Sequence, residues 1–536
     1  MPRTPESSAN ELVGILPERL RKGLTLSEGS LLNAVVVGEE AKCGGEEEIV
    51  RPRDAEKWGK ERVIRSDLIR WLCTDADALK KVDASGIRID GAKFNDELDL
   101  SGLNLPFPLK LTKCRLFEGL SLEYIKMPSL CLSGSQLESL SARYADVRGS
   151  AELDRGFSCE AVVDVSNAKI GADLSFAWNS SVGGLEAGLA TIGGDVVLGG
   201  LFSAKGAVGL SQARIVKDLI CTNGSINVSD GQALNAIYSV IGGDVLLDGG
   251  FKANGQVSLR GAHISGDLNC ERGEFHSSYL KISDNVILTD EPAIDAESAV
   301  VGGDVLLGAG FSVLGPVTFV GAQISGDLDC NKGRFKRSPS SDLEVLNAER
   351  AQIRGTVHLG QGFTSNGGVN LLRTHIGEDL DCSGGTIQNP NGAALVAEGA
   401  EIGGHTLLAE GFSAGGEVRL VGAQIKGNLD CRNASFRNNH PEESALDATS
   451  AVIGGDLFFA RGFKARGPVL LLAAQLMETW IALPENSKSR MGPRLMPSGL
   501  PLTEPFCFGT DSRLRVKSIC GELTLGEIWS AWVAVL

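Results

Sequence analysis

Residues 241–247 read Ile-Gly-Gly-Asp-Val-Leu-Leu, and residues 301–307 repeat them as Val-Gly-Gly-Asp-Val-Leu-Leu. The agreement continues downstream, where Gly-Asp-Leu-Asn-Cys at 266–270 returns as Gly-Asp-Leu-Asp-Cys at 326–330. One phenylalanine keeps its place in each copy, 45 to 60 residues after the one before, at Phe157, Phe202, Phe251, Phe311, Phe363, Phe412 and Phe463. A repeat of this length predicts a supersecondary unit that buries its apolar face only by stacking on further copies.

Short alternating segments predict that the unit is built from strands, because a period of two places one face inward and the other in solvent. In one copy the expected strand starts are Thr406, Val418, Leu429, Leu446 and Leu457. A flat-sided β-helix uses about 20 residues per coil, so each repeat is expected to form two coils. The expected fold class is therefore all-β, a right-handed parallel β-helix (solenoid) with a short N-terminal capping helix.

The length of the repeat varies at one point, after the third strand. The inserted segment is short after Cys382 and Cys431 and longest after Cys270, where residues 276–292 hold the extra chain. Length variation at a fixed point predicts a row of loops along one side of the solenoid, the usual place for binding specificity.

Four segments are expected along the chain. Residues 1–58 are polar, with an acidic run, and predict a mobile leader. Residues 59–85 carry apolar side chains at helical spacing, with Ser66 and Asp67 as helix-start residues, and predict a helical cap over the open end of the solenoid. Residues 86–480 are the expected β-solenoid. Residues 481–536 lack the repeat and form a C-terminal tail whose structure the sequence leaves open.

Composition restricts the partners. The 536-residue chain has a formal net charge of -16, which disfavours direct binding to nucleic acid or to anionic lipid. No secretory apolar segment follows Met1, and no apolar stretch approaches the roughly 20 residues of a spanning helix. We therefore expect a cytoplasmic protein. The apolar end at residues 528–536 is too short to span, so peripheral membrane contact is the most that it offers.

The cysteines are the most conspicuous candidate for chemistry. Five of them share one repeat position, namely Cys221, Cys270, Cys330, Cys382 and Cys431. Each follows a leucine by two residues and so shares its inward face, and Phe176 occupies the same position in an earlier copy. A position that accepts phenylalanine is selected for filling space, and a buried free cysteine behaves as a small hydrophobe. With two coils per repeat these thiols would be about 9.6 Å apart, too far for a disulfide, and no Cys-x-x-Cys pair exists.

Three sets of acidic residues recur with the repeat. The first follows Gly-Gly pairs, and it comprises Asp195, Asp244, Asp304 and Asp456, with His405 in one copy. The second comprises Asp267, Asp327 and Asp379 with Asn428, and the third comprises Asp329, Asp381 and Asp430. Calcium is an alternative for the first set, but calcium-binding β-rolls present several oxygens to each ion. We interpret the first set as solvated turn residues and the other two as a solvent-facing acidic stripe.

Other site types are not indicated. His263 and His375 share a position with arginine and glutamine, which is typical of a tolerant surface site. Glycosidase-like paired carboxylates are neither indicated nor excluded by the evenly spaced acids. The repeats have no helix on which a glycine-rich loop could bind a pyrophosphate, and no Walker-type motif occurs. We predict no catalytic residue, no cofactor-binding residue, no metal ligand and no cofactor.

The elements Ile-Gly-Gly-Asp-Val-Leu-Leu, Gly-Phe, Gly-Ala-Gln-Ile and Gly-Asp-Leu-Asp-Cys resemble those of a bacterial group of β-solenoid proteins, related in style to pentapeptide-repeat proteins. The resemblance covers roughly residues 60–478. Members are often labelled uncharacterised or "membrane-associated oxidoreductase", so the resemblance implies the fold together with an oxidoreductase name that no visible cofactor motif accompanies.

The sequence favours a non-enzymatic acidic β-solenoid that serves as a scaffold or binding platform for a macromolecule, a protein rather than nucleic acid. Self-association is a further option. One alternative is a membrane-peripheral oxidoreductase, as the family label implies. Another is a nucleic-acid mimic that inhibits a DNA-handling enzyme, since an acidic rod can occupy a groove built for a duplex.

Overall fold

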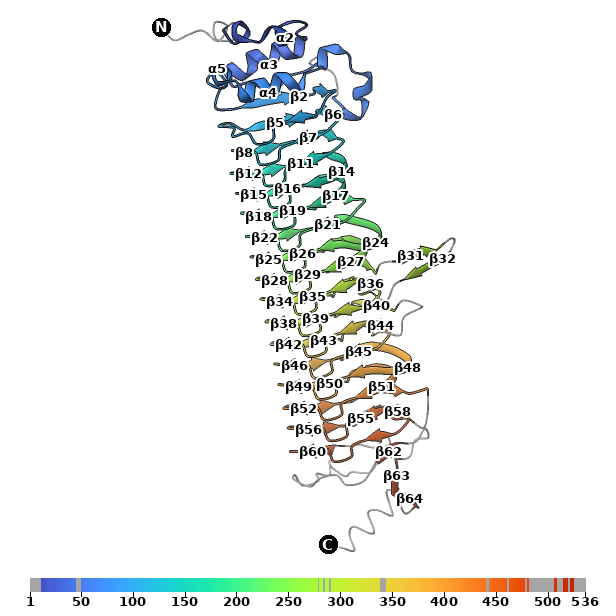
Figure 1. Cartoon of the computed structure of the whole chain (residues 1–536). Helices are drawn as coiled ribbons and strands as arrows, with labels where there is room; N and C mark the ends of the chain where they lie inside the picture. The colour runs from blue at the N-terminus through green and yellow to red at the C-terminus, as the bar shows by residue number, and fades with distance from the viewer. Residues whose placement is uncertain are drawn as a thin grey trace. The chain divides into compact units, whose positions relative to one another are not determined.

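A computed structural model describes residues 11–44, 50–277, 279–282, 285–288, 291–337, 344–439, 443–459, 462–477, 480–481, 506–508, 514–518 and 521–524. The chain divides into two compact units, residues 1–258 and residues 259–536. Each unit is a parallel β-solenoid in which three sheets run along the stacked coils (Figure 1). The expected all-β solenoid with a short N-terminal helix is thereby confirmed.

Unit 1 begins with a helical cap. Its elements are a helical turn over residues 11–15, α2 (Glu18–Arg21), α3 (Leu26–Val37), the 3-10 helices η1 (Pro52–Lys57) and η2 (Lys60–Arg62), α4 (Ser66–Thr74) and α5 (Ala76–Leu79). Thr25 and Glu28 form a reciprocal capping box at the start of α3. The buried Glu28 carboxylate also accepts hydrogen bonds from Arg65 Nε at 2.7 Å and Arg65 Nη2 at 2.9 Å. This ion pair fixes α3 to the residue that precedes α4.

The expected mobile leader, residues 1–58, is wrong for residues 11–44. Leu12, Leu16, Leu20, Leu31 and Leu32 are buried among the helices of the cap. The strand β1 (Ala41–Lys42) pairs in parallel with the first solenoid strand, with Ala41 opposite Ile89. The leader therefore belongs to the cap and covers the strand edge that residues 59–85 were expected to cover.

The strands of unit 1 form three parallel sheets. The first contains β1, β2 (Ile87–Asp90), β5 (Leu109–Thr112), β9 (Leu130–Cys131), β13 (Ala151–Glu152), β16 (Leu174–Ser175), β19 (Val196–Val197), β23 (Leu219–Ile220) and β26 (Val245–Leu246). The second contains β3 (Lys93–Phe94), β4 (Leu98–Asp99), β6 (Arg115–Leu116), β7 (Leu120–Ser121), β10 (Gln136–Leu137), β11 (Leu140–Ser141), β14 (Ser158–Asp164), β17 (Ser181–Glu186), β20 (Ser203–Ala204), β21 (Val208–Gly209), β24 (Ser225–Asn235) and β27 (Lys252–Ser258). The third contains β8 (Lys126–Met127), β12 (Asp146–Val147), β15 (Lys169–Ile170), β18 (Thr191–Ile192), β22 (Arg214–Ile215) and β25 (Val240–Ile241).

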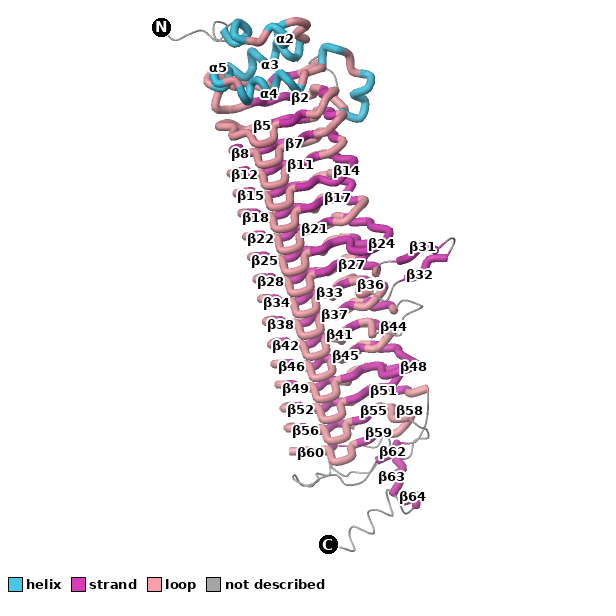
Figure 2. The backbone as a smooth tube through the Cα atoms, in the orientation of Figure 1, coloured by secondary structure: helices cyan, strands magenta, loops and turns pink. Residues whose placement is uncertain are grey.

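Unit 2 has the same three sheets (Figure 2). The first contains β29 (Leu268–Asn269), β35 (Val305–Leu306), β39 (Leu328–Asp329), β43 (Val357–His358), β47 (Leu380–Asp381), β50 (Thr406–Leu407), β53 (Leu429–Asp430), β57 (Leu457–Phe458) and β61 (Trp480–Ile481). The third contains β28 (His263–Ile264), β34 (Val300–Val301), β38 (Gln323–Ile324), β42 (Gln352–Ile353), β46 (His375–Ile376), β49 (Glu401–Ile402), β52 (Gln424–Ile425), β56 (Val452–Ile453) and β60 (Gln475–Leu476).

The second sheet of unit 2 is the one that carries the insertions. It contains β30 (Glu274–His276), β33 (Ile294–Asp295), β36 (Ser312–Leu314), β37 (Val317–Thr318), β40 (Arg334–Lys336), β41 (Leu346–Asn347), β44 (Thr364–Asn366), β45 (Val369–Asn370), β48 (Thr386–Val396), β51 (Ser413–Arg419), β54 (Ser435–Arg437), β55 (Leu446–Asp447), β58 (Lys464–Arg466) and β59 (Val469–Leu470). Between β30 and β33 lies the antiparallel pair β31 (Tyr279–Ile282) and β32 (Asn285–Leu288). The loop row was expected at this point of the repeat, and its position is confirmed.

The registers confirm two coils per repeat. Val357 pairs with Leu380 and Leu380 pairs with Thr406, so that successive coils occupy consecutive positions in the first sheet. The first strand that follows the helical cap begins at Ile87, and the last strand of the first sheet, β61, ends at Ile481. Most of the expected tail, residues 481–536, lies outside the described residues. Within it, β62 (Phe506–Phe508), β63 (Leu514–Ser518) and β64 (Gly521–Thr524) form an antiparallel sheet.

The phenylalanines that recur in the repeat lie in the core. Phe157, Phe202, Phe251, Phe311, Phe363 and Phe412 are buried, whereas Phe463 is partly exposed. We call this inner position 1, and we call a coil that has phenylalanine there a Phe coil. In each following coil, the intervening coil, position 1 is held by Ser180, Gly224, Gly273, Gly333, Gly385 or Ala434. Large and small residues thus alternate from coil to coil.

Two residues further on, at inner position 2, the alternation is reversed. Phe coils place Cys159, Ala204, Ala253, Val313, Ser365, Ala414 and Ala465 there, and intervening coils place Val182, Ile226, Phe275, Phe335, Ile387 and Phe436. The rings of the two coil types touch: the centroid of Phe311 lies 5.4 Å from that of Phe275 and 5.1 Å from that of Phe335. Each coil thus places one large side chain in the same part of the core, from position 1 in a Phe coil and from position 2 in an intervening coil. This is why the sequence repeats every second coil.

Candidate binding surface

The recurring cysteines are structural. Cys221, Cys270, Cys330, Cys382 and Cys431 are completely buried free thiols in the first sheet of intervening coils. Burial raises the pKa of Cys221, Cys330, Cys382 and Cys431 well above the ordinary thiol value. A thiol held protonated is a poor nucleophile and a poor metal ligand, so the interpretation as space-filling residues is confirmed.

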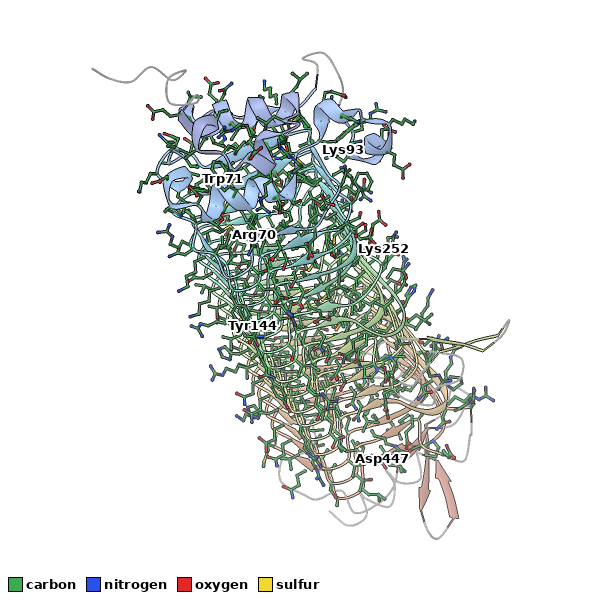
Figure 3. The ribbon with its side chains drawn as sticks, turned by 45° about the horizontal axis from the view of Figure 1, so that its top comes forward. Arg70, Trp71, Lys93, Tyr144, Lys252 and Asp447 are labelled. Carbon is green, nitrogen blue, oxygen red and sulfur yellow. The ribbon has the colours of Figure 1, made fainter. Side chains whose placement is uncertain are left out.

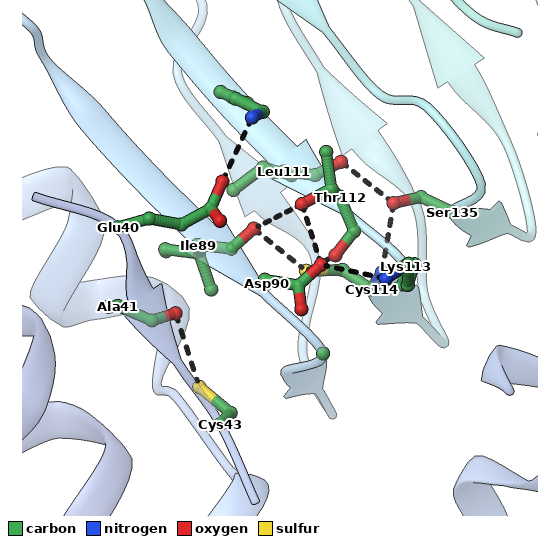
Figure 4. Close-up of polar contacts among 12 residues, drawn as sticks. Glu40, Ala41, Cys43, Ile89, Asp90, Leu111, Thr112, Lys113, Cys114 and Ser135 are labelled. Carbon is green, nitrogen blue, oxygen red and sulfur yellow. Dashed lines mark hydrogen bonds and ion pairs between the residues drawn. The ribbon is translucent and has the colours of Figure 1, made fainter. Parts of the chain in front are cut away.

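The cysteines near the cap are buried in the same way (Figure 4). Cys114 Sγ lies 3.3 Å from the carbonyl oxygen of Thr112 and 3.8 Å from that of Ile89, and Cys43 Sγ lies 4.0 Å from that of Ala41. Burial is the first cause that raises the pKa of both thiols. Beside them, Ser135 Oγ accepts from the Cys114 backbone N–H at 2.9 Å and donates to the Leu111 carbonyl at 2.8 Å. These polar contacts join successive coils and leave no reactive thiol there.

The first two acidic sets are one ladder, which corrects the expectation of separate rows. In unit 1, Asp173, Asp195 and Asp218 each accept a hydrogen bond from the backbone N–H of the equivalent residue in the next coil, at 2.8–3.1 Å. In unit 2, Asp267, Asp304 and Asp327 do the same. Further along, His405 Nδ1 accepts from the Asn428 N–H at 2.9 Å, so the histidine replaces a carboxylate in this role. The carboxylates satisfy turn amides, which supports the turn interpretation over calcium.

The third acidic set also serves the backbone. Asp329, Asp381 and Asp430 accept hydrogen bonds from the N–H two residues on, at 2.8–2.9 Å, and so close Asx turns. The expected solvent-facing stripe is wrong for Asp430, which is buried and is bound by Arg432 Nε at 2.9 Å. The acidic side chains hold corners together as well as solvating the surface.

The histidines and possible metal groups give no site. His263 and His375 are exposed, as expected, and His375 Nδ1 lies 3.2 Å from Glu401. Over the described part of the chain, no group of three or more His, Cys, Asp or Glu side chains is placed to hold a metal ion.

Exposed apolar residues form a surface that the sequence analysis missed. Six large apolar residues have a left-handed backbone, with φ between +54° and +70°: Tyr124, Tyr144, Trp178, Leu189, Leu201 and Tyr238. All six are 48% to 65% exposed, and all belong to unit 1. In unit 2 the described left-handed corners carry glycine or small or polar residues. Such a conformation costs a non-glycine residue roughly 1 kcal/mol, and exposure recovers none of it through packing.

Four of these residues lie at the corner between the second and third sheets, which we call the 2–3 corner. In unit 1 the left-handed residues of this corner form a column that is, coil by coil, Gly102, Tyr124, Tyr144, Asn167, Leu189, Gln212 and Tyr238. The rings of Tyr124 and Tyr144 stack with centroids 4.8 Å apart and an interplanar angle of 3°. The Tyr144 side chain projects from the outside of the coils in Figure 3. The column is an aromatic strip in solvent.

Trp178 and Leu201 lie at the corner between the first and second sheets, which we call the tryptophan corner. Its turns are Arg155-Gly156, Trp178-Asn179 and Gly200-Leu201, joined by bonds from Gly156 N to Trp178 O at 2.8 Å and Asn179 N to Gly200 O at 3.0 Å. A shallow pocket is lined by Arg155, Gly156, Trp178 and Asn179. The space beside Gly156 is open, because a Cβ there would meet no atom within 4 Å.

The Trp178-Asn179 turn differs from its equivalents. In the other described turns with two left-handed residues, at least one is glycine, as in Gly249-Gly250, Gln361-Gly362 and Glu410-Gly411. Trp178 and Asn179 have φ values of 60° and 61° with no glycine. Asparagine adopts this conformation readily, so the strain lies at Trp178, whose exposed side chain lines the pocket. The turn is therefore a candidate functional site.

Comparison of the chain with protein-family models, with curated proteins and with solved structures finds no match. Among the described helices, none combines the length and the apolar character needed to cross a membrane. The surface therefore has to be interpreted from its own chemistry.

Proposed function

We propose that the chain is a non-enzymatic scaffold, an acidic β-solenoid that presents unit 1 to a partner protein. The observation that carries this proposal is the set of six exposed, left-handed apolar residues on the corners of unit 1. Tryptophan, tyrosine and arginine are enriched where proteins bind one another, and clustered exposed apolar residues mark such sites. Cysteine and aspartate side chains, which could support chemistry, are occupied by packing and by turn hydrogen bonds.

Site-specific cross-linking in the native cell tests the proposal. A photoreactive amino acid replaces Leu201 in one full-length chain and Glu410, an exposed corner residue of unit 2, in a control chain. We expect a discrete adduct with another protein from position 201 and none of that mass from position 410. Equal labelling at both positions, or adducts with many proteins, contradicts a specific platform on unit 1.

The two alternatives make different predictions for the protein purified from that cell. A membrane-peripheral oxidoreductase brings flavin or nicotinamide absorbance with the folded chain, and a nucleic-acid mimic displaces duplex DNA from a DNA-handling enzyme in a salt-sensitive manner. We expect neither. Native-state alkylation adds a check: among the cysteines whose side-chain burial the structure describes, Cys131 is the one that is partly exposed, and it is expected to react. Variants with Cys507→Ser and Cys520→Ser remove the tail thiols from this assay.

A further inference from the structure

The outer face of β17 and β20, beside the tryptophan corner, carries glycine and serine at successive positions. Gly183 and Gly206 are half-buried and have no side chain, so their backbone is accessible there. A Cβ on Gly206 would collide with the Gly183 carbonyl oxygen, and one on Gly183 with that of Glu160, so a larger residue does not fit at either position. Ser181 and Ser203 are the neighbouring outward residues. A partner chain can therefore approach the backbone of this face more closely than a face lined with long side chains.

Apolar side chains border one end of this face. Trp178 lies three residues before Ser181, the first residue of β17, and Leu201 lies two residues before Ser203, the first residue of β20. They are 65% and 57% exposed. The Trp178 ring has Gly200 beneath it: a Cβ on Gly200 would be 3.9 Å from Cδ2 of the indole. The coil that carries Trp178 has one more residue between its first strand and Ser181 than the coil of Cys221 has before Ser225. Residues added to exposed turns of a repeat often carry binding function.

Carboxylates border the other end. Asp164 and Glu186 are register neighbours at the ends of β14 and β17. Glu186 extends over Gly209, where its Oε2 occupies the space of an absent Cβ. Among the described residues no basic side chain forms an ion pair with Glu186, while Arg143 lies 3.9 Å from Asp164. Burial, followed by the Asp164 charge, raises the pKa of Glu186.

The remaining charges on the face are of both signs. Glu160 is exposed and pairs with Arg115 at 3.5 Å, and Lys205 is the basic residue between the two ends. Arg115 and Arg143 offset Glu160 and Asp164, so Glu186 is the carboxylate of this face that has no ion pair among the described residues. On a chain of net charge -16, such a carboxylate favours a cationic occupant. A second copy of this acidic chain is a poorer fit to the same surface for the same reason.

We propose that this face, between Trp178 and Glu186, binds a basic segment of a partner protein. An apolar side chain of the segment contacts Trp178 and Leu201, and a lysine or arginine meets Glu186 and Asp164. The contact is made through side chains, because β17 is paired on both sides and offers no free strand edge. The inference rests on the proposed scaffold function and names its partner chemistry.

Selection from a displayed library of random peptides against the full-length chain tests the proposal. We expect enriched peptides to carry net positive charge and a large apolar residue. Their affinity should fall about tenfold or more in the Trp178→Ser/Leu201→Ser variant, as for truncation of an interface hot spot. The matched control is Leu26→Ser, which removes an 82% exposed apolar residue from α3 and should leave the affinity unchanged.

Charge is tested separately. Glu186→Gln should weaken the selected peptides several-fold, whereas Glu410→Gln, which removes the same charge from an exposed corner of unit 2, should not. Equal weakening by both substitutions would show non-specific attraction and overturn the site.

Peptides that bind the double variant as tightly as the parent also overturn it, while leaving the cross-linking test of the scaffold intact. A dimer of the chain that dissociates in the double variant would assign the face to a second copy and overturn the basic-partner proposal. Enrichment of neutral or acidic peptides would do the same.

Discussion

The first coils of unit 1 and the coils that follow Ala151 differ in how large and small side chains are distributed between inner positions 1 and 2. In the first coils, inner position 1 is small and inner position 2 is large in every coil, as Ala92 and Phe94, Cys114 and Leu116, and Ser135 and Leu137 show. From Phe157 onward the large residue changes position in each successive coil. Because uniform coils also stack, alternation is not required for a solenoid of this kind.

The surface supplies a reason for the alternation. The long insertions in the second sheet, as in β24, β48 and the segment that holds β31 and β32, all lie in intervening coils. Phe coils connect the same two strand segments with a short link, for example between β36 and β37. Neighbouring strands are about 4.8 Å apart, whereas packed layers need about 10 Å. Insertions placed in every second coil therefore have room for their side chains.

The largest expected effect is the loss of a position 1 ring. Phe311→Ala should lower the free energy of unfolding by about 3–5 kcal/mol, because it leaves a cavity between Phe275 and Phe335. Denaturant unfolding of the full chain measures this. A loss below about 1 kcal/mol would show that neighbouring coils collapse into the gap and that the alternation is not rigid.

A smaller loss is expected when a side chain is added to an intervening coil. A Cβ on Gly333 would lie 2.5 Å from the Leu307 carbonyl oxygen and 3.0 Å from the Phe335 ring. Gly333→Ala should therefore cost about 1–3 kcal/mol through overpacking. Gly188→Ala is the control, since its Cβ would meet only one atom, at 3.6 Å. Equal unfolding midpoints for the two variants would contradict the need for a small residue at position 1.

The buried thiols give the next effect. Cys330→Ser places a hydroxyl in a completely buried apolar site, so stability should fall by about 1–2 kcal/mol. Cys131→Ser, at a partly exposed site, serves as the control with little change. Thermal unfolding compares them, and a stable Cys330→Ser protein would mean that water or a hidden partner reaches this position.

Loop placement is tested by insertion. A short glycine-serine segment added after Gln388 in β48, within an intervening coil, should cost no more than about 1 kcal/mol of loop entropy. The same segment added after Leu314, in a Phe coil, should cost more. Leu314 pairs with His276 and Lys336, and each of these residues is followed by an insertion, so the added segment would lie between two others. Equal costs in chemical denaturation would remove the steric explanation of the two-coil period.

The smallest effect is expected at the tryptophan corner. Trp178→Gly removes an exposed indole and relieves a left-handed backbone, two opposing changes of roughly 1 kcal/mol or less. The free energy of unfolding of the variant should stay within about 1 kcal/mol of that of the parent. A loss of several kcal/mol would show that Trp178 is structural and would weaken its assignment as a contact residue.

Periodic residues in the core were predictable because burial imposes a repeating size and polarity. Phe311 was placed inward from its recurrence in each repeat, and Cys330 from its position two residues after Leu328; both are buried. The leader was misjudged because its polar composition and acidic run were given more weight than the four-residue spacing of Leu12, Leu16 and Leu20, which is helical and places all three in the buried part of the cap. The two aspartate sets looked separate because the sequence repeat spans two coils, while their backbone contacts join adjacent coils.

The exposed corner residues were missed because a tyrosine or leucine does not reveal a positive φ. A signal was present in the same column, where Gly102, Asn167, Gly261 and Gly321 mark left-handed corners. Aromatic residues among glycine and asparagine at one repeat position would have identified Tyr124, Tyr144 and Tyr238 as exceptions. The pocket at Trp178 could not be predicted, since it depends on how two adjacent turns align.

Confining insertions to every second coil has a consequence for protein engineering. Each extended segment in the second sheet is separated from the next by a plain coil that buries its own ring. Foreign peptides could be exchanged at β24 and β48 independently, because neither graft would share a supporting layer with the other. A chain built in this way can acquire several recognition elements one at a time without redesign of its interior.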